Sequence, residues 1–365
     1  MGINGLSSFL AKKAPHYRRL VPTEWFANKW IAVDTYLLGY AYMSTAIGGE
    51  AKKVMHTKDM KLDHDSLMNK WLSRFMSTIA TMKEAKMNPV FVFDGKPPIE
   101  KELTRNRRNE NKNNVRNEIN QLQSKLEDED LETDIATRER ITKLLARDVR
   151  ITPQHWNRLI NLLKDLGIPV IKAKGEGEAL CATLVRNGEC YAVFTQDSDA
   201  GAYLTPRVIT RIDTPMFTET GKRVQQCEVI YYNQVFQKLE LSPEQFVDLC
   251  CMCSNDYSDN IPNWGPNKCY NLLIKYGNID NIPKEVYDWT PLNHHRVREI
   301  FNTPGEIEDG CIEEGEMCSD INNKLAGMGL LRSATRLLNL LKGSSSSSSD
   351  YNYYPPEDYD SMELL

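Results

Sequence analysis

The sequence predicts an α/β fold in which helices cover both faces of a mainly parallel sheet. Short apolar runs that suit buried strands alternate with longer segments of helical periodicity, and this alternation is typical of parallel strands joined by helical crossovers. Several of the apolar runs also end on an acidic residue. Open sheets of this class place their functional sites at the ends of their strands, so the same observations predict where a site lies.

The strands and helices can be assigned in chain order. The predicted strands are WIAVD (30–34), PVFVFDG (89–95), IPVIKA (168–173), CYAVFT (190–195) and RVITRI (207–212). Thr152 and Pro153 predict an N-cap and a first helical turn, and Gly167 ends that helix. Beyond about residue 225 the pattern becomes helical, with a capping box at 242–245.

Composition excludes several classes of protein. The chain has 365 residues, of which 41% are hydrophobic and 26% charged, as in an ordinary globular protein. It shows neither an apolar run of membrane-spanning length nor a signal-peptide core, so we expect a soluble intracellular protein. The nine cysteines lack the paired spacing of a zinc site, which favours buried free thiols.

The net charge of −5 is unevenly distributed. Residues 301–365 carry 12 acids and 4 bases, whereas residues 1–300 carry 38 acids and 41 bases. The body of the protein can therefore present basic surfaces to a nucleic acid in spite of the acidic total.

Residues 101–150 are almost wholly polar, which predicts either a solvated helical excursion or a partly disordered insertion. Six bases and two acids lie within 101–116. Lys101 and Arg108 are seven residues apart, which places them on one face of a helix. For 101–116 we favour contact with a charged substrate, and for 125–150 a solvated helix.

The acidic residues at the strand ends are the main functional signal. They are Asp34, Asp94, Glu176 and Glu178 in GEGEAL, and Asp197 and Asp199 in VFTQDSDAG, with Asp256 as a further candidate. Crowded acids repel one another unless a cation neutralises them. Carboxylate oxygens suit Mg²⁺ or Mn²⁺, and two such ions fit the number of acids better than one. A pair of ions would hydrolyse a phosphodiester.

Two further features have alternative interpretations. Tyr40 lies six residues after Asp34 and is either a core residue or a stacking platform for an unpaired base. The segment 254–276 contains turn residues at 263–266 and then a helix with Lys268. It is either an ordinary packing unit or a module whose turn amides and helix N-terminus bind a phosphate.

In combination, the motifs resemble those of flap endonucleases and the wider XPG-type family of structure-specific 5′ nucleases. The motifs are MGI-x-GL, the VD strand end, VFDGKPP, E-x-E-A, T-x-D-x-D and NDY-x₃-IP-x₂-GP-x-K, and the resemblance runs from residue 1 to about residue 280. It implies a PIN-like α/β nuclease core, a helical arch insertion and a helix–turn–helix module of the helix-hairpin-helix kind that binds DNA.

The resemblance also implies roles for individual residues. The seven acids would hold two Mg²⁺ ions, with Mn²⁺ as a substitute, and Lys101 and Arg108 would engage the scissile phosphate. Tyr40 would stack on a terminal base, and the module at 254–276 would hold K⁺. Further DNA contacts would come from Gly2, Arg74, Arg105, Arg107, Gly265, Asn267 and Lys268.

The implied organisation has six parts. They are a nuclease region (1–100), the arch (101–150), a second nuclease region (151–240), the duplex-binding module (241–300), a helical and acidic region (301–342) and a disordered Ser-rich acidic tail (343–365). The chain departs from the family pattern at Gly177, Ser254 and Asn263, and Arg74 lies one turn before Thr78, where the family has an arginine.

These observations predict a Mg²⁺-dependent 5′ nuclease that cuts branched or flapped DNA in replication, repair or recombination. The alternatives are a 5′ exonuclease on nicked or recessed ends and a non-catalytic branched-DNA-binding protein. No clamp-binding box is present, so a sliding clamp is not an expected partner. We expect a monomer that acts without a membrane, in the nucleus or, for a virus-encoded protein, at the viral replication site.

Overall fold

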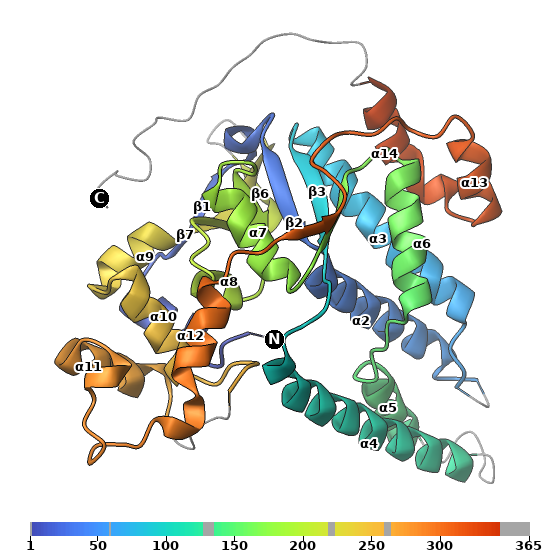
Figure 1. Ribbon diagram of the computed structural model, residues 1–365. Helices are drawn as coiled ribbons and strands as arrows, with labels where there is room; N and C mark the ends of the chain where they lie inside the picture. Colours follow the sequence, from blue (N-terminus) through green and yellow to red (C-terminus); the bar gives the residue numbers. More distant parts are fainter. Residues whose placement is uncertain (1, 58–59, 127–134, 218–222, 259–263, 344–365) are drawn as a thin grey trace.

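The computed structural model describes residues 2–57, 60–126, 135–217, 223–258 and 264–343. An eight-stranded sheet with the order β1-β7-β6-β5-β2-β3-β4-β8 forms its centre (Figure 1). The strands are β1 (Arg18–Pro22), β2 (Trp30–Asp34), β3 (Asn88–Phe93), β4 (Val170–Ala173), β5 (Ala192–Phe194), β6 (Arg207–Phe217), β7 (Arg223–Tyr231) and β8 (Ile307–Asp309).

The sheet is mainly parallel, as the sequence predicts. Strands β6, β5, β2, β3 and β4 run parallel to one another, and the flanking strands β1, β7 and β8 pair antiparallel. Each of the five predicted strands is present in this parallel set.

The prediction of helix from about residue 225 is wrong for the first part of that segment. Residues Arg223–Tyr231 form β7, which pairs with β6 in the register Val208↔Ile230 and Ile209↔Val229. The polar stretch around Gln225 and Gln226 carries little strand signal. Its conformation is set by pairing with β6 on one side and β1 on the other, which local sequence does not reveal.

Alternate residues of the central strands enter two different cores. In β2, Ile31 and Val33 belong to the larger core, and Ala32 belongs to the smaller one. In β3 the larger core receives Phe91 and Phe93, and the smaller one receives the intervening valines. This period of two is what a sheet buried on both faces requires.

Helices cover both faces of the sheet (Figure 1). The larger core contains residues of α2 (Thr35–Val54), α3 (His64–Glu84), α6 (Pro153–Asp165), α13 (Ile321–Gly327) and α14 (Leu331–Gly343). The smaller core contains residues of α7 (Gly177–Arg186). The predicted N-cap at Thr152 and the Pro153 first turn are both present at the start of α6.

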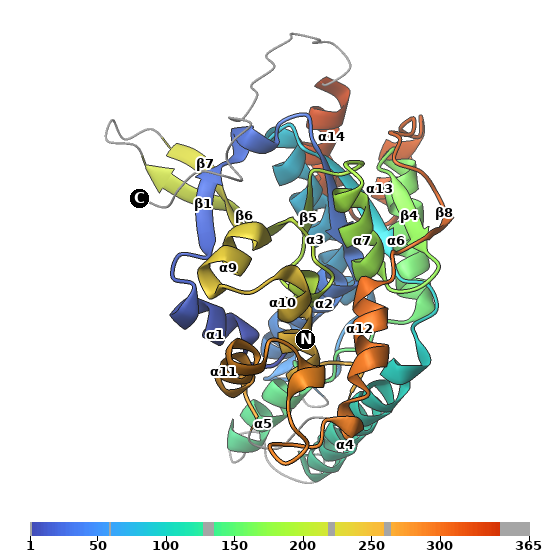
Figure 2. The same cartoon turned by 60° about the vertical axis from the view of Figure 1, so that its left-hand side comes forward.

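A second group of helices packs on α1 (Leu6–Lys13) and has its own core. Figure 2 shows α1, α9, α10 and α11 grouped below the antiparallel strands β1 and β7. The group comprises α8 (Asp199–Ala202), α9 (Tyr232–Leu239), α10 (Pro243–Met252), α11 (Pro266–Tyr276), the short helices η3 (Ile279–Asn281) and η4 (Thr290–Leu292), and α12 (His294–Asn302). The predicted capping box begins α10, where Ser242 and Gln245 exchange hydrogen bonds.

The polar segment after β3 is helical where the structure describes it. The short helix η2 (Ile99–Lys101) leads into α4 (Glu102–Leu126), and α5 (Ile135–Leu145) packs against α4 below the sheet (Figure 1). A small core of five buried residues joins the two helices to the body. Residues 127–134 lie outside the described part of the chain.

Two other expectations concern the whole molecule. Among the described residues, no helix is both long and apolar enough to cross a membrane. The cysteines are all free thiols, and seven of the nine are buried. Beyond Gly343, the predicted tail at 343–365 lies outside the described residues. The division of the chain into six parts stays a prediction.

The packing of α2 against α6 generates a stability prediction. A Cβ atom at Gly39 would lie 2.2 Å from the Trp156 ring, whereas one at Gly48, on the same helix, would meet nothing within 4 Å. Gly39→Ala should therefore destabilise the fold by about 1–3 kcal/mol through overpacking. Gly48→Ala should stabilise it by about 0.5–1 kcal/mol through helix propensity. Urea unfolding of the two variants measures both effects, and equal effects of the same sign would contradict this packing.

Candidate metal and nucleic-acid site

The predicted acids lie at one edge of the sheet because parallel strands end there together. Asp34 is the last residue of β2, and Asp94 directly follows β3. Asp197 follows β5, and Asp199 begins α8. Glu176 is the N-cap residue of α7, so its carboxylate lies at a helix N-terminus, where the helix dipole stabilises negative charge.

A threonine links the acids of two neighbouring strands. The hydroxyl of Thr195 donates a hydrogen bond to Asp34 Oδ2 at 2.8 Å and accepts one from the Asp197 backbone N–H at 3.1 Å. The Leu37 N–H donates to the other Asp34 oxygen at 3.3 Å. Both the ends of β2 and β5 are therefore fixed by buried hydrogen bonds, and Asp34 is held in one orientation.

The departure at Gly177 has a structural counterpart. The Gly177 N–H donates a 2.8 Å hydrogen bond to Asp94 Oδ1, and a Cβ atom at this position would lie 2.6 Å from the same oxygen. The missing side chain lets the first turn of α7 approach Asp94 closely. Glycine at this position thus joins Asp94 to the helix that carries Glu176 and Glu178.

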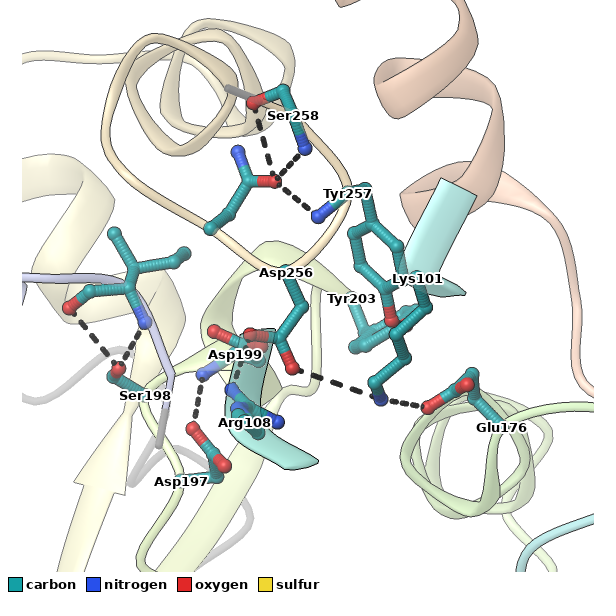
Figure 3. A network of polar contacts seen from close by, with 12 residues as sticks. Lys101, Arg108, Glu176, Asp197, Ser198, Asp199, Tyr203, Asp256, Tyr257 and Ser258 are labelled. Carbon is teal, nitrogen blue, oxygen red and sulfur yellow. Dashed lines mark hydrogen bonds and ion pairs between the residues drawn. The ribbon is translucent and has the colours of Figure 1, made fainter. Parts of the chain in front are cut away.

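Two cationic side chains, one at the end of η2 and one on α4, reach the acids (Figure 3). Lys101 Nζ forms an ion pair with Glu176 and lies 3.8 Å from Asp256 Oδ2. Arg108 donates to the other oxygen of Asp256 at 2.5 Å. The two predicted bases therefore lie on one side, as their spacing indicates, and they bring the arch, α7 and the loop after α10 together.

Burial and mutual repulsion perturb the acids at the strand ends. Burial raises the pKa of Asp34 to about 6, although the Thr195 hydrogen bond opposes this shift. Burial, followed by the negative charge of Glu176, raises the pKa of Asp94 to about 7. These carboxylates resist ionisation because too little positive charge lies beside them.

The acids on α7 and α8 are perturbed in the same direction. Burial and then the charge of Asp197 raise the pKa of Glu178 and of Asp199 well above the usual range, and burial also raises the pKa of Asp197. Burial alone would lower the pKa of Lys101, but neighbouring carboxylates, Glu176 first, hold it above its usual value. Lys101 is therefore cationic, yet one lysine does not balance this many acids.

The donor chemistry of the acid cluster fits divalent cations, although no three of the seven acids bring their oxygens within 4.8 Å of one another in the described chain. Asp199 Oδ1 is buried and has no hydrogen-bond partner in the described part of the chain, which is costly for a polar atom unless an ion or water contacts it. The donors are all carboxylate oxygens from seven acids, the ligand type that Mg²⁺ and Mn²⁺ prefer. Cations among these side chains would remove the repulsion that raises their pKa values.

The N-terminal segment lies against the acid cluster. A Cβ atom at Gly2, whose φ is +98°, would lie 2.0 Å from Asp197 Oδ1. The Ile3 N–H donates to the Ser198 hydroxyl at 2.9 Å, and the Asn4 N–H donates to the Ser254 carbonyl at 3.0 Å. Only glycine fits at position 2 with this backbone and this approach, so the predicted Gly2 borders the site.

Tyr40 and the cations of α4 lie together beside the acids. The half-buried Tyr40 ring contacts Trp156 edge-on, and Lys112 Nζ lies 5.0 Å from its centroid. Burial and then the charge of Asp94 raise the Tyr40 pKa, and nearby Arg108 and Arg105 oppose this effect. Tyr40 is therefore partly a core residue and partly a ring available at the site.

The structure does not bring every predicted DNA contact to this site. Arg107 is exposed on α4. Arg74 is exposed on α3 and borders a hollow with Lys70 and Ser333, and none of the seven acids lines that hollow. Arg74 therefore lies toward α14 rather than toward the strand ends, and its contact with DNA stays a prediction.

In the predicted duplex-binding module, helix α11 begins beside the N-terminal segment. Gly265 is the N-cap residue, Asn267 is exposed, and Lys268 Nζ lies 3.6 Å from the centre of the Trp264 ring. A Cβ atom at Gly5 would lie 3.4 Å from Pro266, so this helix start adjoins the chain that borders the acids. Asn263 lies outside the described residues.

Two features of the site were not predicted from the sequence. Thr195 belongs to the T-x-D-x-D motif, and this was the signal that could have identified it as a residue of the site. Arg296 of α12 donates to Glu100 Oε1 of η2 at 2.7 Å, and this pair fixes the residue next to Lys101. Nothing in the sequence links two residues so far apart, and only the packing of α12 against the arch base reveals the contact.

Comparison with known proteins identifies the family. The model of the XPG N-terminal domain matches residues 1–115, and that of the XPG I-region matches residues 167–256. Flap endonuclease 1 of Entamoeba dispar is 30% identical over 308 residues, covering 83% of this chain and 76% of that protein. Flap endonuclease 1 of Cryptosporidium muris is 32% identical over 317 residues, and the match spans 84% of this chain but 64% of that protein.

Solved structures share the fold at low sequence identity. The catalytic core of Rad2 in complex with a DNA substrate has a TM-score of 0.62 at 19% identity and covers 93% of this chain and 100% of its own. Flap endonuclease-1 from Methanococcus jannaschii has a TM-score of 0.57 at 19% identity, covering 90% and 97%. The family models and the curated relatives show that this chain belongs to the XPG and flap endonuclease family of structure-specific nucleases.

Proposed function

We propose that this protein is a Mg²⁺-dependent 5′ nuclease that hydrolyses phosphodiesters in branched DNA near a junction between single strand and duplex. The observation that carries the proposal is the meeting of seven carboxylates with two cationic side chains of the arch base. Family membership supports a nuclease, and the preference for a flap is our inference.

The seven acids would share two ions. Asp34, Asp94, Glu176 and Glu178 would help to hold the metals, and Asp197, Asp199 and Asp256 would complete the shell of the second ion, partly through water. When bound, the Mg²⁺ pair would supply an ionised water and would offset the charge that develops on the phosphate oxygens. The protein contributes by fixing these carboxylates, as the hydrogen bonds of Thr195 and Gly177 do.

Lys101 and Arg108 would bind the scissile phosphate. Lys101 already lies beside Glu176, and Arg108 lies beside Asp256. A phosphate can therefore take the place of the carboxylate, and each cation keeps an anionic partner. Their charges are then preorganised where negative charge grows during the reaction. The Glu100–Arg296 pair holds the backbone beside Lys101 and thereby orients it.

The remaining surface would grip DNA by shape. Arg105 and Arg107 on the arch offer cations to the backbone, Tyr40 offers a ring for stacking, and the helix start at Gly265, with Asn267 and Lys268, offers amides and a cation to a phosphate. These contacts read no base edge, so specificity would come from the junction itself. A K⁺ ion at this module stays a prediction, because residues 259–263 lie outside the described part of the chain.

We propose that it acts as a monomer on nuclear or viral DNA during replication, repair or recombination. The test uses end-labelled flap, nicked, recessed and blunt duplexes with Mg²⁺ or EDTA. We expect Mg²⁺-dependent cutting of the flap close to the junction. The Asp197→Ala variant should bind the flap but not cut it, and Glu316→Gln, which alters an exposed acid outside the cluster, should cut normally. Undiminished cutting by Asp197→Ala contradicts the scheme, and binding without cutting by the wild type would indicate a binding protein.

The role of the arch cation generates a second prediction. Lys101→Ala should lower the single-turnover rate on a flap by about 10²–10³-fold, because a preorganised charge at the reacting phosphate is lost. The dissociation constant should change little, since many other contacts hold the duplex. Lys125→Ala, at the far end of α4, is the matched control and should retain the wild-type rate. Equal losses in both variants would mean that the charge acts only in general attraction of DNA.

The raised acid pKa values predict how stability depends on pH. The folded pKa of Asp94, about 7, lies above its usual value of 3.8, so the folded state binds more protons than the unfolded state between about pH 4 and about pH 7. In EDTA, stability should fall as pH rises through this window. Asp94→Asn keeps the acceptor for the Gly177 N–H and should raise the melting temperature at about pH 8 but not at about pH 4. An equal effect at both pH values would contradict the assignment.

A further inference from the structure

Two histidines and an aspartate meet at the start of α12, away from the acid cluster. His294 Nε2 lies 2.8 Å from Asp280 Oδ1, and His295 Nε2 lies 3.4 Å from the same oxygen. Throughout the part of the chain that the structure describes, these three residues form the one group of potential metal ligands whose donor atoms all lie within 4.8 Å of one another. Asp280 belongs to η3, and both histidines belong to α12.

We propose that Asp280, His294 and His295 bind a first-row transition metal ion, with Zn²⁺ as the preferred occupant. Tetrahedral zinc with bonds of about 2.0–2.1 Å places its ligand atoms about 3.4 Å apart. The His295 distance to Asp280 matches that spacing, and the His294 distance of 2.8 Å is shorter, at hydrogen-bond length. Two imidazoles and one carboxylate suit Zn²⁺ far better than Mg²⁺, which prefers oxygen. The fourth position remains open to water or another ligand.

A simple hydrogen bond between histidine and aspartate explains only part of this arrangement. It accounts for His294, whose side chain is 11% exposed, but not for His295, which is 73% exposed and converges on the same oxygen. The two rings lie side by side, 4.2 Å apart between centroids.

The contacts around the cluster favour this orientation of the ligands. Arg298 lies 3.2 Å from Asp280 Oδ2 and 2.7 Å from Asp248 Oδ1, so it fixes the Asp280 carboxylate through one oxygen and leaves the other to face the histidines. Support of a ligating carboxylate by a second residue is usual in metal sites. His294 Nδ1 is buried without a partner among the described residues, so the ring is oriented by what its Nε2 contacts.

The location gives the ion a structural consequence. It would join η3, which follows α11, to the N-terminus of α12. The next residue of α12, Arg296, holds Glu100 at the base of the arch, and Arg298 holds α10 through Asp248. An ion at this position would brace the joint between the helical module and the arch. This inference does not depend on the proposed nuclease activity.

The test is a titration of the full-length protein with Co²⁺ in excess Mg²⁺, which competes for sites made of carboxylate oxygens alone. We expect one Co²⁺ per chain with the visible absorption of a tetrahedral site, displaced by Zn²⁺. His295→Ala and Asp280→Asn should each weaken this binding at least about tenfold, since each removes one of three ligands. His64→Ala, which removes an exposed histidine on α3, is the matched control and should bind as the wild type does.

A second measurement separates specific binding from misfolding. Zn²⁺ should raise the melting temperature of the wild type and of His64→Ala but not that of His295→Ala, while all three should melt alike in EDTA. In ¹⁵N-histidine spectra, Zn²⁺ should shift the ring signals of His294 and His295 alone. Equal Co²⁺ binding by wild type and His295→Ala, or the absence of any tetrahedral site, overturns the proposal.

Discussion

The electrostatic cost of holding many carboxylates at one sheet edge is the constraint on which the rest of this structure depends. Parallel strands bring Asp34, Asp94 and Asp197 together, and burial then raises their pKa values. Such a cluster is tolerable only where hydrogen bonds fix each acid and cations approach it. The N–H of Gly177, the Thr195 hydroxyl and the Lys101 ammonium meet these requirements from three other parts of the chain.

The same charges connect the parts of the molecule. The arch base reaches the nuclease sheet because Lys101 and Arg108 pair with Glu176 and Asp256, and it reaches α12 because Glu100 pairs with Arg296. A small apolar core joins α4 and α5 to the body, and the ion pairs at the root of α4 add to that attachment. Ligands that compete for these carboxylates or cations would therefore act on the arch as well as on the chemistry.

Local sequence predicted most of the elements that create the site. The strands that end at Asp34 and before Asp94 are short apolar runs rich in β-branched and aromatic residues, which suit a strand buried on both faces. The antiparallel strand β7 was missed because its glutamine-rich start acquires strand structure from pairing with β6 and β1. The place of Arg74 beside α14 could not be predicted for a related reason, since a position in a helix does not specify the direction in which that helix faces.

The sequence by itself determined the chemistry. It showed which strands end on acids, which bases share one helix face in the arch, and which family the motifs resemble. Only the tertiary structure decided which charges meet. The contacts between Lys101 and Glu176, between Glu100 and Arg296, and among Asp280, His294 and His295 join distant segments. Ion pairing and ligand geometry depend on distances of a few ångströms, and these distances follow from how helices pack on the sheet rather than from their order along the chain.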